Sequence, residues 1–166
     1  MMNEEAYKQE FLKRVQKHIN RVNQFAQKLG LSYPQHDNDK LSSPLLDVYY
    51  LDKKSDYVDL TDEEEQLLLN AGMNHRLNNP HHPEYWDKGN IESMTGLRGN
   101  PTKLFNVESM PQEALEEMCC DWCAMSKEFG NTPFEWYNHI KGKRYNFTPK
   151  QEQFILKTLK KLWYSK

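Results

Sequence analysis

Residues 112–129 read QEALEEMCCDWCAMSKEF and carry a strong signal for the fold of this chain. Apolar side chains recur there at the three- and four-residue spacing that places them on one face of an α-helix. We expect this helix to turn a stripe of side chains inward: Leu115, Met118, Trp122, Met125 and Phe129. Asp121 lies on or beside that stripe, and a buried carboxylate stays charged only with a cation or hydrogen-bond donors nearby. One segment therefore combines a core helix with a candidate binding group.

Five further helices are predicted, and the longest covers residues 4–29, where apolar residues recur at helical spacing before Gly30. Three helix starts carry a capping box, a Thr followed three residues later by Glu or Gln, whose side chains bond to free backbone N–H groups. These starts are Thr61, Thr132 and Thr148, and a short helix is expected after Pro44. No segment alternates as a strand does, so we predict an all-α fold of about six helices.

Residues 78–111 lack helical periodicity and contain several glycines and prolines, so we expect a long and mostly irregular segment. Long loops inside compact domains usually carry function. The stretch NNPHHPEYW at 78–86 concentrates two histidines, Glu84 and aromatic residues in this loop.

The 166 residues include 22 Lys and Arg against 24 Asp and Glu, which gives a formal net charge of −2 with both signs mixed along the chain. This balance is no strong signal for nucleic-acid binding, and no apolar run approaches the ~18–20 residues of a membrane helix. The first residues lack the apolar stretch of a secretory signal, so we expect a cytoplasmic protein without a membrane partner. Cys119, Cys120 and Cys123 are interpreted as core residues, although two of them have CxxC spacing.

Histidines and acids that could bind a metal are spread over several predicted elements. The candidate ligands are His18, His36, Asp37, His75, His81, His82 and Asp121. Singly, each has an ordinary interpretation as a hydrogen-bonded core histidine, a solvated turn residue or an ion-paired acid. Together they supply the imidazole and carboxylate ligands that suit Zn, Mn or Fe at one or two sites.

This order of ligands resembles the HD superfamily of all-helical metal phosphohydrolases. The resemblance implies one HD-like helical domain over residues 1–166, with a metal-site core at about 11–140 and a C-terminal helix at about 149–164. It implies a divalent transition metal, as one or two ions of Mn, Fe, Zn, Ni or Co. One ion would be held by His18, His36, Asp37 and Asp121, and a second by Asp37, His75 and one of His81 or His82. HDNDK at 36–40 resembles the HDxxK of some members, in which the lysine, here Lys40, contacts phosphate.

At finer grain, NNPHHPEYW and EMCCDWCAMSKEFGN (117–131) resemble an uncharacterised family of small phage and bacterial proteins with HDxSK-, NPHHPEYW- and EMxxDWxAMS-like blocks. Two features depart from these relatives. Asp39 stands where they usually place a small residue, which bears on how a substrate phosphate would approach. His75 and His81 are also closer in sequence than the corresponding pair of the dinuclear enzymes.

Three charged residues are candidates for catalysis beside the ligands. Lys40 and Arg76 could hold negative oxygens, and Arg76 directly follows His75. Glu84 is a candidate general base or partner of a ligand, because it follows His82 by two residues. Each also has an ordinary interpretation as a surface charge or a loop ion pair.

The sequence favours an enzyme, a metal-dependent phosphohydrolase that acts on a nucleotide or another small phosphorylated molecule through a metal-activated water. No P-loop, GxGxxG, GxSxG or HExxH motif points to another enzyme class. Two alternatives stay open. One is a non-catalytic phage or bacterial accessory protein that binds a nucleotide or a host protein, with a structural metal or none. The other is a di-iron oxygenase on the same ligands.

Overall fold

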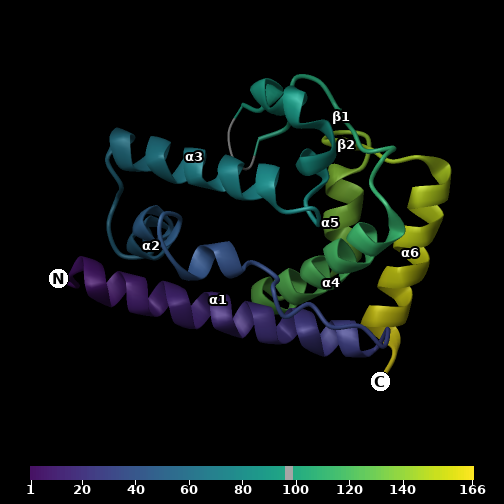
Figure 1. The fold of residues 1–166 in the computed structure, drawn as a ribbon, viewed down its shortest axis with the longest axis horizontal. Helices are drawn as coiled ribbons and strands as arrows, with labels where there is room; N and C mark the ends of the chain where they lie inside the picture. Colours follow the sequence, from purple (N-terminus) through teal and green to yellow (C-terminus); the bar gives the residue numbers. More distant parts are fainter. Residues whose placement is uncertain (96–98) are drawn as a thin grey trace.

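The computed structural model describes residues 1–95 and 99–166, and their architecture is all-α, as predicted (Figure 1). The α-helices are α1 (Glu4–Gln27), α2 (Leu46–Lys54), α3 (Asp62–Asn78), α4 (Gln112–Phe129), α5 (Pro133–Ile140) and α6 (Pro149–Tyr164). Two 3₁₀-helices lie among them, η1 (Asn38–Leu41) and η2 (Pro83–Ser93). Each of these α-helices corresponds to a helix predicted from the sequence.

The predicted capping boxes form at the starts of α3, α5 and α6. In each, the threonine side chain accepts a hydrogen bond from the backbone N–H three residues on, and the Glu or Gln there bonds back. α1 ends slightly before its predicted limit, at Gln27, and Gly30 follows with a φ of 71°, which glycine adopts at little cost. Local sequence therefore sets these helix ends.

The main hydrophobic core lies where α4 packs between α1 and α6 (Figure 1). Its buried side chains include Val22 of α1, Leu115 and Met118 of α4, and Ile155 and Leu159 of α6. Cys119, Cys120 and Cys123 are free thiols buried in the same core, which confirms their interpretation as core residues. Apolar side chains of the core therefore cover one side of α4.

The predicted inward stripe of α4 does not extend to the end of the helix. Phe129 is 59% exposed, so the expectation is wrong at this position. The reason is that Phe129 lies in the last turn of α4, where the helix borders a cavity rather than a packed partner. Met125, one turn earlier, is half-buried and lines the same cavity.

On the other side of this cavity, α1, α2 and α3 are held together by a second, smaller group of packing contacts. The amino-terminal half of α1 packs against α2, and α2 packs against α3 (Figure 1). Phe11, Val15 and Ile19 form the apolar centre of this region, with Leu41, Leu46 and Tyr49 packed on it. α3 buries only Ala71, Gly72 and His75. A histidine is therefore among the few buried side chains of that helix.

Between α3 and α4, the described residues 79–95 and 99–111 include regular structure that the sequence does not predict. Residues 96–98 of the predicted irregular segment lie outside the described residues. η2 occupies part of this segment, and β1 (Phe105–Asn106) pairs in parallel with β2 (Tyr145–Asn146), just before α6. Strands of two residues show no alternation, so the sequence pattern did not predict them. Within the described part of the chain, no helix combines the length and apolarity needed to cross a membrane.

Candidate metal centre

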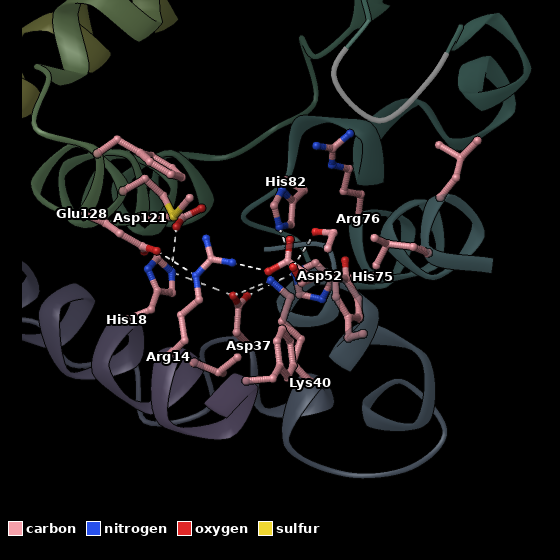
Figure 2. A pocket seen from close by; sticks show the side chains of 18 of the residues that line it. Arg14, His18, Asp37, Lys40, Asp52, His75, Arg76, His82, Asp121 and Glu128 are labelled. Carbon is pink, nitrogen blue, oxygen red and sulfur yellow. Dashed lines mark hydrogen bonds and ion pairs between the residues drawn. The ribbon is translucent and has the colours of Figure 1, made fainter. Parts of the chain in front are cut away.

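The predicted metal ligands come from separate parts of the chain and meet in one place. Figure 2 labels His18, Asp37, His75, His82 and Asp121 among them. They are His18 on α1, His36 and Asp37 in the loop before η1, His75 in the last turn of α3, His81 and His82 in the loop that follows, and Asp121 on α4. Their ligand atoms form neighbouring groups, and within a group the atoms lie within 4.8 Å of one another. The fold therefore brings every predicted ligand into one cluster.

The first group joins His18, His36 and Asp121. The Nε2 atom of His18 lies 3.0 Å from Oδ1 of Asp121 and 3.2 Å from Nε2 of His36. Oδ2 of Asp37 lies 3.8 Å from the same His18 atom. Ligands that surround one transition-metal ion at about 2.0–2.2 Å have mutual distances of this order.

The second group joins Asp37 to His75, His81 and His82. Oδ1 of Asp37 lies 3.2 Å from Nε2 of His75 and 3.3 Å from Nε2 of His81. His82 approaches through its own Nε2, 3.1 Å from that of His75. Asp37 therefore lies between the two groups. Its Oδ2 faces His18, and its Oδ1, which faces His75 and His81, also lies 3.6 Å from Nε2 of His36.

Carboxylates behind the histidines determine how the rings are protonated. Nδ1 of His36 lies 2.8 Å from Glu117, and Nδ1 of His81 lies 3.3 Å from the same carboxylate oxygen. Nδ1 of His75 is 2.8 Å from Asp39. An ionised carboxylate only accepts hydrogen bonds, so each Nδ1 carries the proton and donates it. Whenever one of these rings is neutral, the lone pair on its Nε2 then points toward Asp37, as in carboxylate–histidine–metal arrangements.

These lone pairs meet carboxylate oxygens, which are also electron-rich. Nε2 of His81 and Oδ1 of Asp37 are buried and have no hydrogen-bond partner, although they lie only 3.3 Å apart. Such buried polar atoms are costly unless a proton or a cation lies between them. The donor set, imidazole nitrogen with carboxylate oxygen, suits a divalent transition metal. This buried His/Asp cluster could therefore hold a metal ion.

Neighbouring charges keep the carboxylates of the cluster ionised. Burial acts to raise the pKa of Asp37, but Lys40 and His75 outweigh it and hold that pKa well below its ordinary value. Burial acts in the same way on Asp121, but the hydrogen bond with His18 helps to bring its pKa down to about 2. Both groups are therefore available as anionic ligands at neutral pH.

Two histidines of the second group, His81 and His82, have pKa values shifted in opposite directions. Burial acts to lower the pKa of His81, but the neighbouring carboxylates of Asp37 and Glu117 raise it to about 10. Burial and the neighbouring His81 and His75 hold the pKa of His82 well below its ordinary value. A proton on His81 and a metal ion therefore compete for the same buried carboxylates.

Comparison with known protein families gives one match, to a family of unknown function (DUF5662), over residues 7–161. The chain belongs to this family. The match covers every candidate ligand and confirms the expected relation to an uncharacterised family. No curated protein and no solved structure matches this DUF5662 chain.

In this DUF5662 chain the cluster opens into a cavity of about 1090 Å³ lined by residues of α1, α2, α3 and α4, among others. The cluster residues His18, Asp37, His75, His82 and Asp121 line it. Among the described residues, four cationic side chains do so as well: Arg14, Lys40, Arg76 and Arg144. A molecule in this cavity would meet the candidate metal ligands and positive charges together (Figure 2).

Lys40 lies directly beside the cluster. Its Nζ is 2.9 Å from Oδ2 of Asp37 and 5.3 Å from the centre of the Tyr49 ring. Burial acts to lower the pKa of Lys40, but Asp37 raises it above its ordinary value, so the ammonium group stays charged. The position suits a lysine that contacts an anionic substrate.

Glu84 and Arg76 form a separate pair behind the second group. Glu84 is fully buried, and its Oε1 accepts a hydrogen bond of 2.8 Å from the Tyr145 hydroxyl and lies 3.9 Å from Arg76. Of these three residues, Arg76 and Tyr145 line the cavity. A general base must reach the proton that it removes. The geometry therefore favours Glu84 as a partner of Arg76 over Glu84 as the base.

Two carboxylates at this centre are absent from the predicted set. Glu117 lies four residues before Asp121 on α4, so the two share a helix face, and that spacing could have identified it. Asp39, which appears in the sequence as a departure from related proteins, accepts hydrogen bonds from His75 and Asn79. Its carboxylate thus holds a ligand histidine in place.

Proposed function

We propose that this DUF5662 chain is a divalent-metal-dependent phosphohydrolase that acts on a small phosphorylated molecule, with nucleotides as the first substrate class to test. The observation that supports it is the buried His/Asp cluster, centred on Asp37, which opens into a cavity that also carries cationic side chains. The order of the ligands along the chain, which resembles that of HD phosphohydrolases, supports the same assignment.

The two groups of ligands would hold one ion each. His18, His36 and Asp121 would bind the first, Asp37 would bridge, and histidines 75, 81 and 82 would supply the ligands of the second. The donor chemistry suits Mn, Fe, Zn, Ni or Co. When bound, such an ion lowers the pKa of a coordinated water from 15.7 towards about 7 and polarises a phosphoryl oxygen.

The chain's own residues would position the substrate. Lys40, charged and adjacent to Asp37, would donate hydrogen bonds to a phosphoryl oxygen. Arg76, with its guanidinium oriented by Glu84, would bind a further anionic group of the substrate. The Tyr145 hydroxyl in turn fixes Glu84. The cluster and Lys40 would then neutralise negative charge that develops during phosphoryl transfer.

The first test is the metal content of untagged protein by inductively coupled plasma mass spectrometry. We expect one or two equivalents of a transition metal in the wild type and a loss in Asp121→Ala. Asp52→Asn is the matched control, because Asp52 lines the same cavity and pairs with Arg14 instead of the histidines. A folded wild type that holds no metal and takes up neither Mn nor Fe would contradict the proposal.

The second test is release of phosphate from nucleoside monophosphates and sugar phosphates by the metal-loaded protein. Metal-dependent release that disappears in Asp121→Ala supports the phosphohydrolase. The cluster also favours one second candidate, a di-iron oxygenase, because five imidazoles surround a shared carboxylate. Bound iron together with an O₂-dependent reaction would support that candidate. A tight nucleotide or protein complex without turnover would support a non-catalytic accessory protein.

A further inference from the structure

Arg144 is a buried cation that the metal centre does not use. It is 3% exposed, yet it lines the same cavity as the cluster. Its backbone N–H donates to Ile140 at 2.9 Å, and its carbonyl accepts from the backbone N–H of Phe105 at 3.0 Å. The turn that leads to it includes Gly142 with a φ of 67°. The β1–β2 pair and this turn therefore hold Arg144 at a defined place on the cavity wall.

The guanidinium group of Arg144 is only partly satisfied. Its Nη2 donates to the carbonyl of Gly99 at 2.8 Å, and the group lies 5.8 Å from the centre of the Trp136 ring. Its Nε is buried and has no hydrogen-bond partner. A guanidinium carries five N–H donors in a planar fork, and a buried one is costly unless it is paired.

The cationic side chains that line the cavity differ in their counter-charges. Arg14 pairs with Asp52 and Glu128, and Lys40 pairs with Asp37. Arg76 has Glu84 at 3.9 Å. Among residues 1–95 and 99–166, by contrast, no carboxylate forms an ion pair with Arg144. The cavity wall therefore carries a positive charge that a bound anion would balance.

Arg144 is connected to Arg76 through neighbouring residues. Tyr145, the next residue in the chain, bonds to Glu84, and Glu84 is the carboxylate that lies near Arg76. In Figure 2 the Arg76 side chain extends past His82 and away from Asp37. Burial raises the pKa of Tyr145, and both arginines act against that rise, so both lie near its hydroxyl. Both also line the cavity.

Resting on the proposed function, we propose that Arg144 and Arg76 form a second anion subsite, which binds a phosphate group other than the one that is hydrolysed. Two arginine forks on one wall match the geometry and charge of a phosphate. The substrate class is then a small molecule with two separate phosphate groups. One group would lie at the metal centre and the other on the arginines.

The test uses inorganic phosphate as the probe and full-length protein stripped of metal by chelation. Isothermal titration calorimetry compares the wild type with Arg144→Gln and with Lys143→Gln, which removes the same charge from the exposed neighbour. We expect the wild type to bind phosphate and Arg144→Gln to bind it about tenfold to one hundredfold more weakly. Lys143→Gln should stay within roughly twofold of the wild type.

Absence of phosphate binding to the wild type, or equal binding to the wild type and Arg144→Gln, would overturn the subsite. Because Arg144 is buried, a second measurement uses no variant at all. The ¹⁵N signal of the Arg144 Nε–H group should move saturably as phosphate is added, and a signal that does not move would also overturn it. Neither measurement depends on metal or hydrolysis, so failure of the subsite is distinguishable from failure of the phosphohydrolase.

Discussion

The two sides of α4 bury polar atoms in different surroundings, apolar side chains on one side and charged groups on the other. On its core side, Cys123 is surrounded by apolar groups, and burial raises the pKa of its thiol to about 12. On its cavity side, burial acts to raise the pKa of Asp121 as well, but His18 and its neighbours bring that pKa down to about 2. A buried group is neutral in apolar surroundings and stays charged only beside a partner of opposite charge.

This contrast indicates what each side of α4 requires. The core side is satisfied by packing alone, since its thiols stay neutral among aliphatic and aromatic side chains. The cavity side brings carboxylates and imidazole lone pairs together and leaves Asp37 and His81 atoms unpaired. Its stability therefore depends on protons or on an ion. Substitutions on the cavity side should change metal content, and substitutions on the core side should change the free energy of unfolding.

Replacing Asp37 should have the largest effect on the cavity side. Asp37→Ala removes the carboxylate that connects both ligand groups, so we expect loss of all bound metal and of metal-dependent activity. The loss should exceed the roughly 10–100-fold that removal of an outer partner costs. Metal content by mass spectrometry, with Asp52→Asn as the control, measures it. Full metal content in Asp37→Ala would show that the cavity side of α4 does not need this carboxylate to bind metal.

Replacing Glu117 should have an intermediate effect, because it holds both His36 and His81 from behind. In Glu117→Gln the charged acceptor is lost, and we expect metal affinity to fall by about 10–100-fold. Titration with a competing chelator measures this affinity. Glu116→Gln, at the adjacent position on α4, is the matched control and should bind metal as the wild type does. Equal affinity in both variants would show that Glu117 does not support the ligands.

Acid should weaken the cavity side of the metal-free protein. The folded pKa values of Glu117 and Asp121 are about 2, whereas unfolded chains have ~4.3 for Glu and ~3.9 for Asp. The unfolded chain then binds protons more readily, so the stability that these groups contribute is present above about pH 4 and is lost as the pH falls towards 2. Circular dichroism against pH should show this loss. A smaller loss is expected for Glu117→Gln.

Replacing a core thiol should have the smallest effect on the metal. Cys123→Ala removes a buried sulfur from the core side, so we expect a loss of about 1 kcal/mol in the free energy of unfolding. Metal content and activity should match the wild type, because Cys123 belongs to the core and not to the ligand groups. Urea unfolding and metal analysis on the same sample measure both. Loss of metal in this variant would make the cysteine a ligand.

Much of the fold follows from local sequence signals. The capping boxes at Thr61, Thr132 and Thr148 and the stripe on α4 predict helices that the structure contains. These signals work because helix starts and amphipathic faces depend on residues three or four apart. The β1–β2 pair and the exposure of Phe129 were not predicted, since both depend on which elements meet in space.

In the candidate site, too, some features can be predicted from the sequence and others depend on tertiary contacts. The candidate ligand residues, imidazoles with carboxylates in a given order, are visible in the sequence. The roles of Glu117 and Asp39 were not, because each acts through a histidine far away in the chain, such as His36 for Glu117. The partner of Glu84 was also hidden, since Tyr145 lies 61 residues further along the chain.

The all-α fold and the set of residues able to bind a metal can be read from the sequence, because helix periodicity and side-chain chemistry are local properties. The position of Asp37 between both groups of histidines and the burial of Arg144 on the wall of the same cavity depend on tertiary packing. Burial and the distance between charges arise only when helices pack. Those two quantities decide which side chains are charged and what they can hold.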